Sequence, residues 1–328
     1  MRRFSIRLVL LLAVSFAVGL LLATYLVVTV PGHASEPGEN EPVATEPDTK
    51  FDGRRAYDYL KQVVALGPRP SGSAGMRAQQ KLLAAHFRAQ GGKVSFQAFR
   101  HRHPIDGSTV PMANLFVQWH PQRKQRILLC AHYDTRPFPD RDKVNPRGRF
   151  VGANDGGSGV ALLMELGHVA ARLKGRYGID FVLFDGEEFV FSDRDPYFVG
   201  SEYFARSYAG NPPSFRYRWG VLFDMVADTD LQLFQEVNST RWRDTRPLVN
   251  DIWNVARQLG VTEFVARPKY EIRDDHLKLR QIGRIPTCDL IDFDYPWWHT
   301  EGDTPEHCSA ESLDKVGRVI VAWLRQLK

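Results

Sequence analysis

The chain has 328 residues, with 43 Lys and Arg against 38 Asp and Glu, which gives a formal net charge of +5 at pH 7. Hydrophobic residues make up 43% and charged residues 25%, proportions that exclude collagen-like, wholly disordered and multi-span membrane chains. The basic excess is spread along the sequence, so we expect no nucleic-acid partner. Three cysteines without a Cys-x-x-Cys pair exclude a zinc-finger framework and a disulfide-stapled scaffold.

An uncharged apolar stretch occupies residues 8–30 and follows Arg2, Arg3 and Arg7. Its length is sufficient to cross a membrane, so residues 1–30 are predicted to be a signal-anchor or a cleaved signal peptide. Because flanking arginines stay in the cytoplasm, we expect a membrane-anchored or secreted protein whose folded domain is extracytoplasmic. Residues 31–52 are rich in Pro, Glu and Thr and are predicted to be a flexible linker.

Helical and strand-like segments alternate after the linker. Amphipathic periodicity predicts helices at 55–66 and 75–90, separated by Gly and Pro. Further along, the predicted strands lie at 93–99, 126–133, 179–188, 218–228 and 285–294, and the predicted helices at 160–173, 246–259 and 310–327. This order predicts a single α/β domain over residues 53–328, with a central, mostly parallel sheet flanked by helices. Reactive groups of such folds collect at the carboxyl ends of the strands.

Two adjacent glutamates, Glu187 and Glu188, follow the apolar residues 181–184 after Asp185 and Gly186. Their mutual repulsion must be offset by a cation or by protonation of one carboxylate. Adjacent glutamates are common on surfaces, but this position at a strand end favours a metal ligand beside a general base. Asp155 lies in a Gly-rich loop before a helix, where a helix N-cap alone would also explain it.

Further acids and two histidines occupy similar positions. His132 ends a predicted strand, Asp224 follows another, and Asp275 belongs to an Asp-Asp-His string. His299 follows Trp297 and Trp298 among turn-forming residues, as expected for an imidazole at an aromatic rim. Each residue alone could be a cap, a surface charge or a structural histidine. Together they form a nitrogen and oxygen donor set suited to zinc: His132, Asp155, Glu187, Glu188, Asp224 and His299.

Several strings of the sequence resemble, in this order, the zinc-dependent aminopeptidase family and especially its glutaminyl cyclase branch. They are GPRPSGS, HYDT, GANDGGSGVALLMEL, FDGEEF, GSEYFA, LFDM, DDH and WWHT, and the resemblance covers about residues 53–328. It implies an α/β domain with a central mixed sheet and a zinc site at its strand ends. Asp155, Glu188 and His299 match the zinc ligands of cyclases, and Glu187 matches the acid–base residue.

The two branches of the family imply different reactions. A cyclase would bind one zinc ion and convert the N-terminal Gln of a peptide to pyroglutamate with release of ammonia. An aminopeptidase would bind a second zinc ion, held by His132 and Asp224 and bridged by Asp155, and would hydrolyse the first peptide bond. A third alternative is a non-catalytic peptide-binding protein, against which the complete ligand set and Glu187 argue.

Motifs around the ligands favour the cyclase. They are the Phe-Asp-Gly before the glutamates, the insertion at 189–199, and the Asp-Asp-His string together with the Trp directly before the last His. Animal cyclases carry a tryptophan in that insertion, whereas this chain has Phe189, Phe191 and Tyr197. LFDMVAD, in contrast, looks equally like the peptidase pattern.

The resemblance also implies roles for neighbouring side chains. Asp224 and Asp275 are predicted to be hydrogen-bonding partners of Glu187 during proton transfer. Trp298 is predicted to form an apolar wall for the glutamine side chain, with a packed core aromatic as the alternative. The expected substrates are peptide or protein N-termini. A disulfide between Cys288 and Cys308 stays open at this point, as does the oligomeric state.

Overall fold

The computed structural model describes residues 50–327. The predicted membrane segment at 1–30 and nearly all of the linker at 31–52 lie outside these residues. The localisation inferred from them therefore stays a prediction. Within 50–327, no helix has both the length and the apolar character needed to cross a membrane. The described residues belong to one unit, which is the predicted α/β domain.

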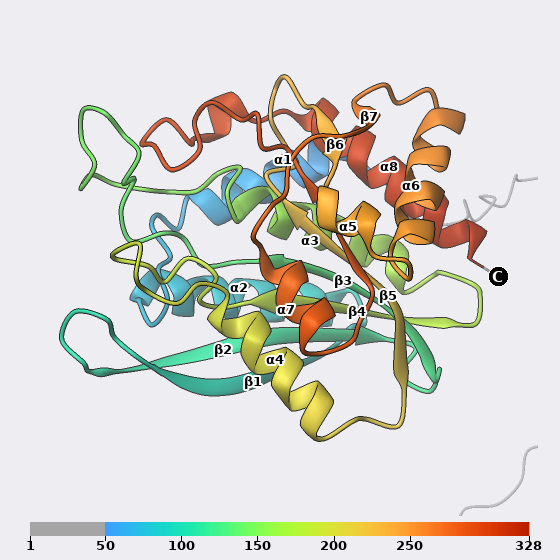
Figure 1. Ribbon diagram of the computed structural model, residues 1–328, viewed down its shortest axis with the longest axis horizontal. Helices are drawn as coiled ribbons and strands as arrows, with labels where there is room; N and C mark the ends of the chain where they lie inside the picture. Colours follow the sequence, from blue (N-terminus) through green and yellow to red (C-terminus); the bar gives the residue numbers. More distant parts are fainter. Residues whose placement is uncertain (1–49, 328) are drawn as a thin grey trace, which may run out of the picture. The chain divides into compact units, whose positions relative to one another are not determined.

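A six-stranded mixed sheet forms the centre of this unit, in the order β1-β2-β4-β3-β5-β8 (Figure 1). Its strands are β1 (Lys93–Arg102), β2 (Thr109–Trp119), β3 (Gln125–His132), β4 (Tyr177–Phe184), β5 (Arg216–Asp224) and β8 (Thr287–Ile291). The strands β4, β3, β5 and β8 are parallel, whereas β2 runs antiparallel to both β1 and β4. The mostly parallel sheet predicted from the alternation of elements and the mixed sheet implied by the resemblance are thus confirmed.

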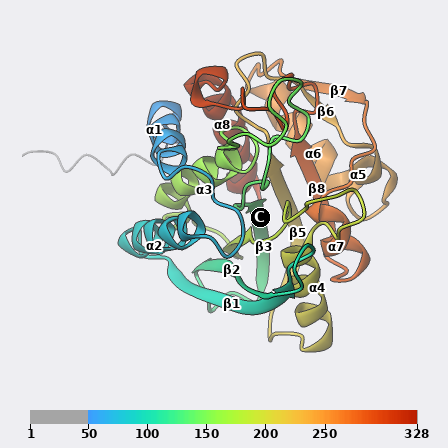
Figure 2. The same ribbon diagram turned by 90° about the vertical axis from the view of Figure 1, so that its left-hand side faces the viewer.

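Helices cover both faces of the sheet (Figure 2). One layer holds α1 (Gly53–Val64), α2 (Ala74–Ala89), α3 (Gly157–Ala170), α6 (Arg246–Gln258) and α8 (Ala310–Gln326), and the other holds α4 (Val199–Gly210) and α7 (Asp275–Gln281). Successive side chains along a strand point to opposite faces of the sheet and so pack against the two layers alternately. Leu129 and Val221 pack in the larger core, whereas Leu128 and Leu222 pack against α4 and α7.

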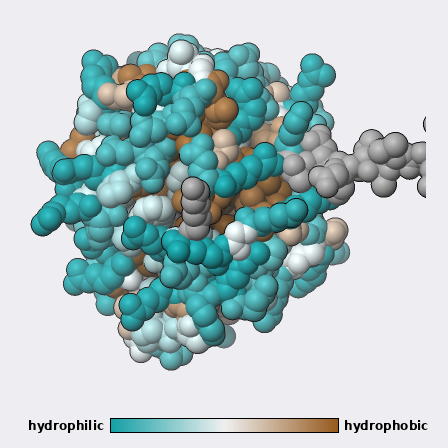
Figure 3. All heavy atoms as spheres, turned by 90° about the vertical axis from the view of Figure 1, so that its right-hand side faces the viewer, coloured by the Kyte–Doolittle hydropathy of each residue, from teal (hydrophilic) through white to brown (hydrophobic). Residues whose placement is uncertain are grey.

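Shorter elements complete the unit: β6 (Leu233–Gln235), α5 (Val237–Arg241), β7 (Phe264–Pro268) and the 3₁₀ helix η1 (Pro305–His307). β6 and β7 pair in parallel as a separate two-stranded sheet. On the face shown in Figure 3, hydrophilic side chains cover most of the surface and hydrophobic ones show between them. This distribution agrees with a core that is enclosed by the two helical layers.

The strand β2 has no counterpart among the predicted elements. Pro111 and Asn114 interrupt its pattern, and both residue types are depleted in strands. Asn114 is nevertheless fully buried, because its amide donates to the carbonyl of Gly200 at 2.9 Å and its oxygen accepts from the backbone N–H of Asp185 at 3.1 Å. Tertiary hydrogen bonds therefore outweigh the local preference here.

The three cysteines are buried free thiols. Cys288 and Cys308 both belong to the larger core but do not form the disulfide that the sequence left open. Cys130 is fully buried in β3, as predicted.

A buried ion pair joins the first two parallel strands. Arg126 in β3 and Asp180 in β4 are both fully buried, and Arg126 Nε donates to Asp180 Oδ2 at 2.8 Å. Replacing Arg126 with Met should lower the free energy of unfolding by about 3–5 kcal/mol, because it leaves a buried carboxylate unpaired. Urea unfolding measures this loss. The double variant Arg126→Met/Asp180→Asn should lose less than the single one, and an equal or larger loss would contradict the explanation.

A histidine between the helices of the larger layer predicts a pH-dependent stability. Burial, aided by Arg55, lowers the pKa of His168 to about 4, and its Nε2 lies 2.8 Å from the hydroxyl of Tyr59. The unfolded chain therefore binds more protons than the folded one between about pH 6.5 and pH 4, so stability falls as pH falls through this window. The urea midpoint should drop more steeply there in the wild type than in His168→Gln. Parallel profiles would contradict this.

Candidate metal centre and cleft

The predicted ligands gather at the carboxyl edge of the parallel strands. His132 ends β3, Asp224 ends β5, and the chain after β4 carries the glutamates. Asp155 reaches the same edge from the loop before α3, where Gly156 has φ +79°. A Cβ at this glycine would lie 2.9 Å from the His132 ring, so the loop approaches the histidine as closely as it does only because residue 156 has no side chain.

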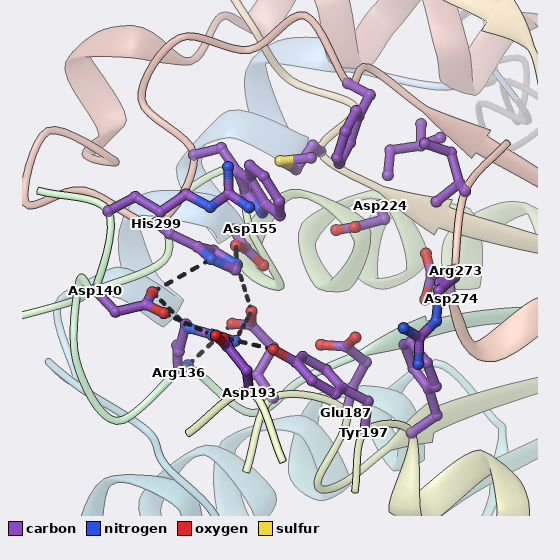
Figure 4. A pocket seen from close by; sticks show the side chains of 18 of the residues that line it. Arg136, Asp140, Asp155, Glu187, Asp193, Tyr197, Asp224, Arg273, Asp274 and His299 are labelled. Carbon is purple, nitrogen blue, oxygen red and sulfur yellow. Dashed lines mark hydrogen bonds and ion pairs between the residues drawn. The ribbon is translucent and has the colours of Figure 1, made fainter. Parts of the chain in front are cut away.

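One set of ligands consists of Asp155, Glu188 and His299. Their donor atoms lie within 4.8 Å of one another, and all three residues are buried. His299 Nε2 lies 2.7 Å from Glu188 Oε1 and 3.4 Å from Asp155 Oδ2 (Figure 4). These are the three residues that the sequence resemblance predicts to be the zinc ligands of a cyclase.

A second set consists of His132, Asp155 and Asp224, again within 4.8 Å. His132 Nε2 lies 3.2 Å from Asp155 Oδ1 and 3.3 Å from Asp224 Oδ1. Asp155 thus belongs to both sets: its Oδ1 lies near His132, and its Oδ2 lies near His299. A carboxylate in this position can bridge two cations.

The charges of the first set fit a bound cation. Burial, together with Glu188, raises the pKa of Asp155 to about 6, and its Oδ2 has no hydrogen-bond partner. Burial would also raise the pKa of Glu188, but His299 and Arg136 outweigh it and lower the value to about 2. Closely spaced buried carboxylates are costly unless a cation offsets them. With imidazole nitrogens beside them, these oxygens form a donor set that suits zinc.

Glu187 lies beside the ligands without belonging to either set. Figure 4 shows its carboxyl group directed into the cleft. Burial raises the pKa of Glu187 well above its ordinary value, although His132, with Nδ1 3.9 Å from Glu187 Oε2, opposes the shift. A carboxyl group with a raised pKa can both take up and give back a proton near neutral pH, as acid–base catalysis requires.

Two buried aspartates hold the backbone of the site. Asp134 accepts the backbone N–H groups of Glu187 at 3.1 Å and of Glu188 at 3.0 Å. Asp303 accepts the backbone N–H of Asp155 at 3.1 Å. Asp134 lies in the string HYDT and Asp303 shortly after the string WWHT, yet neither has a predicted role. Nothing in a single sequence shows which distant N–H group a carboxylate accepts.

The metal centre opens into a cleft of about 660 Å³. Its walls include Met225, Phe293 and Trp298, and the Trp298 ring is tilted against Phe293 with 4.7 Å between their centroids. From the insertion, Tyr197 also lines the cleft, whereas Phe189 packs in a separate cluster with β1 and β2. Tyr197 and the neighbouring Phe198 are thus the aromatic residues of the insertion that line the cleft.

Asp274 lines the cleft, whereas Asp275 does not. Asp274 caps α7 by accepting the N–H of Asp275 at 2.5 Å, and burial raises its pKa well above the ordinary value. Asp275 is fully buried at the start of the helix. Asp274, the N-cap of α7, is thus the aspartate of this pair that lines the cleft, and the proton-transfer role of Asp275 stays a prediction.

An α/β fold with a carboxylate and imidazole centre at its parallel strand ends defines a metal-dependent enzyme. Residues 114–324 match the model of peptidase family M28, which covers more than half of the chain. The chain belongs to this family, and zinc is the metal that the family and its zinc-dependent exopeptidase structures support.

Individual relatives come from both branches. The chain is 26% identical over 247 residues to a glutaminyl-peptide cyclotransferase from Bos taurus, a match that covers 65% of each chain. The crystal structure of Fimbriiglobus ruber glutaminyl cyclase is 38% identical, has a TM-score of 0.81 and covers 90% of this chain and 100% of that one. A leucine aminopeptidase precursor from Bacteroides thetaiotaomicron is 30% identical with a TM-score of 0.79, covering 85% and 98%.

Proposed function

We propose that the chain is a zinc-dependent glutaminyl-peptide cyclotransferase, which converts the N-terminal Gln of peptides to pyroglutamate and releases ammonia. The similarity to Fimbriiglobus ruber glutaminyl cyclase, at 38% identity over 90% of this chain, carries the proposal. The tryptophan directly before the last ligand, Trp298, supports it because its ring lines the cleft.

Asp155, Glu188 and His299 would hold the zinc ion. When bound, zinc supplies a Lewis acid for the γ-carbonyl oxygen of the substrate glutamine. Trp298 and Phe293 offer apolar surface to the two methylene groups of that side chain, which excludes water from the reacting carbonyl. Exclusion of water matters because hydrolysis of the same amide would give glutamate instead of the lactam.

Glu187 would transfer the proton of the reaction. The substrate's α-amine nitrogen forms a bond to its own γ-carbonyl carbon, and the bond from that carbon to the amide nitrogen breaks. Glu187 takes a proton from the attacking amine and returns it to the leaving nitrogen, so that ammonia departs and the carboxylate is regenerated. Asp274 lines the cleft, and its carboxyl group, when ionised, helps to raise the pKa of Glu187, which favours the protonated form between the two steps.

The second candidate is a two-zinc aminopeptidase. The complete set of His132, Asp155 and Asp224 favours it, because a one-zinc enzyme leaves two of these residues without a metal-binding role. The similarity to the leucine aminopeptidase precursor also supports it. Glu187 would then take a proton from a water molecule that attacks the first peptide bond.

A paired assay on the purified chain with zinc separates the two candidates. Ammonia release is followed from a Gln-initiated peptide, and amino-acid release from a Leu-initiated one. Ammonia with a product lighter by one ammonia, and no free leucine, is the result expected for the cyclase. Free leucine without ammonia would overturn the proposal in favour of the aminopeptidase, and activity in neither assay would overturn both.

A further inference from the structure

Two arginines at the cleft carry no carboxylate partner. Arg141 and Arg273 both line the cleft and are exposed. Within residues 50–327, neither guanidinium forms an ion pair with an acidic side chain, whereas Arg136, in the same cleft, pairs with Asp140 and Glu188. The charges of Arg141 and Arg273 are therefore available to a bound molecule.

The acids at the cleft rim are mostly neutralised by other cations. Asp140 pairs with Arg136 at 2.7 Å, and Glu271 pairs with Arg241 at 2.9 Å. Among the described residues at the rim, Asp193 is an exposed acid without an ion pair. Its single negative charge is smaller than the combined positive charge of Arg141 and Arg273. The outer part of the cleft thus has an excess of positive charge, although its floor is acidic.

The guanidinium of Arg141 lies directly on the wall of the cleft. Its Cζ is 3.9 Å from the centroid of the Trp298 ring, and its backbone N–H donates to the carbonyl of His299 at 3.1 Å. Stacking on the ring face leaves the in-plane N–H groups free to donate to a ligand. Arg141 therefore presents its charge next to the surface that would hold the first residue of a peptide.

Arg273 approaches the cleft from the loop before α7. It lies between Ile272 and Asp274, both buried residues that line the cleft, while its own side chain is exposed. Figure 4 shows Arg273 at the margin of the cavity. Arg273 and Arg141 thus reach the cavity from different segments of the chain.

We propose that Arg141 and Arg273 select substrates with an acidic side chain directly after the N-terminal residue. The inference rests on the proposed cyclase function and names its substrate class. When the first residue occupies the cavity at the metal centre, the second residue is at the mouth. A Glu or Asp carboxylate there meets two donors that bind carboxylates through several N–H groups, whereas a Lys side chain meets like charge.

The test compares three Gln-initiated peptides that differ only in the second residue, which is Glu, Gln or Lys. We expect kcat/KM of the zinc-loaded full chain to be about tenfold higher for the Glu peptide than for the Lys peptide at ~0.01 M salt, the order expected of a few solvent-exposed ion pairs. The difference should lie mainly in KM, because neither arginine contacts the reacting atoms. The ratio of kcat/KM between the Glu and Lys peptides should approach 1 at ~1 M salt, where charges are screened within about 3 Å.

Charge-reversing variants identify the residues. Arg273→Glu should invert the order of the Glu and Lys peptides, and Arg141→Gln should lower the ratio while Arg141→Lys retains most of it. The matched control is Arg88→Glu, which changes the net charge equally on the exposed surface of α2, outside the cleft. It should leave the ratio unchanged.

Different outcomes overturn different statements. The inference would be overturned by equal kcat/KM for the three peptides, or by an unchanged preference in Arg273→Glu and Arg141→Gln. Ammonia release in the same assays would still support the proposed cyclase function. A shift in Arg88→Glu as large as in Arg273→Glu would show a general charge effect and would also overturn it. No ammonia from any of the peptides would overturn the proposed function, and the inference with it.

Discussion

Replacing Glu187 with Gln should leave the zinc content unchanged and lower turnover by about 10²–10⁴-fold, the usual contribution of general acid–base catalysis. The glutamine has nearly the same size and keeps the backbone N–H that Asp134 accepts at 3.1 Å, but it cannot carry the proton. Glu187 is also outside both ligand sets, so metal binding does not depend on it. Ammonia release from a Gln-initiated peptide and metal analysis of the same preparation measure both effects.

The control for this variant is Glu306→Gln, which makes the same chemical change on an exposed residue of η1. It should turn over substrate like the wild type. Near-normal activity of Glu187→Gln would remove Glu187 from the mechanism, whereas loss of zinc together with activity would assign it to the ligands instead.

Replacing His299 with Ala should abolish activity through loss of the metal. His299 is the single nitrogen donor of the set with Asp155 and Glu188, and its Nε2 lies 2.7 Å from the Glu188 carboxylate. Two carboxylates alone are a poor site for zinc, which binds imidazole strongly. Metal analysis should show one zinc ion fewer per chain than in the wild type, and activity should fall to background.

The zinc content of a parallel variant, His132→Ala, shows whether the wild type binds one zinc ion or two. If the wild type holds one zinc ion at the cyclase set, His132→Ala keeps it, whereas in a two-zinc enzyme each variant loses one ion. His103→Ala, on the hairpin between β1 and β2, is the control for the loss of an imidazole elsewhere. Full zinc content and activity in His299→Ala, with an unchanged urea midpoint, would show that His299 is not a ligand.

The positions of the ligands could be predicted because they depend on simple rules. Parallel strands end at one edge of the sheet, so acids and histidines that follow apolar runs must meet there. His132, Asp224 and the two glutamates meet this condition, and the structure brings them together with Asp155. The long helices could be predicted for the same reason, since α1, α2, α6 and α8 each carry a clear apolar periodicity.

What could not be predicted depends on contacts between distant segments. Whether Asp274 or Asp275 faces the cleft is decided by the residue at which the short helix α7 begins, and short helices have weak periodicity. The partners of Asp134 and Asp303 are backbone groups more than 50 residues away in sequence. The burial of Asn114 likewise depends on hydrogen bonds to α4 that no local pattern shows.

The shared position of Asp155 between two ligand sets has a consequence for inhibitor design. A compound that binds mainly through a metal-chelating group would depend on donors that both candidate functions share, so it could not distinguish a cyclase from an aminopeptidase. Selectivity must then come from groups that reach past the metal centre. An anionic substituent placed between Trp298 and the mouth of the cleft would contact Arg141, a residue that takes no part in metal binding.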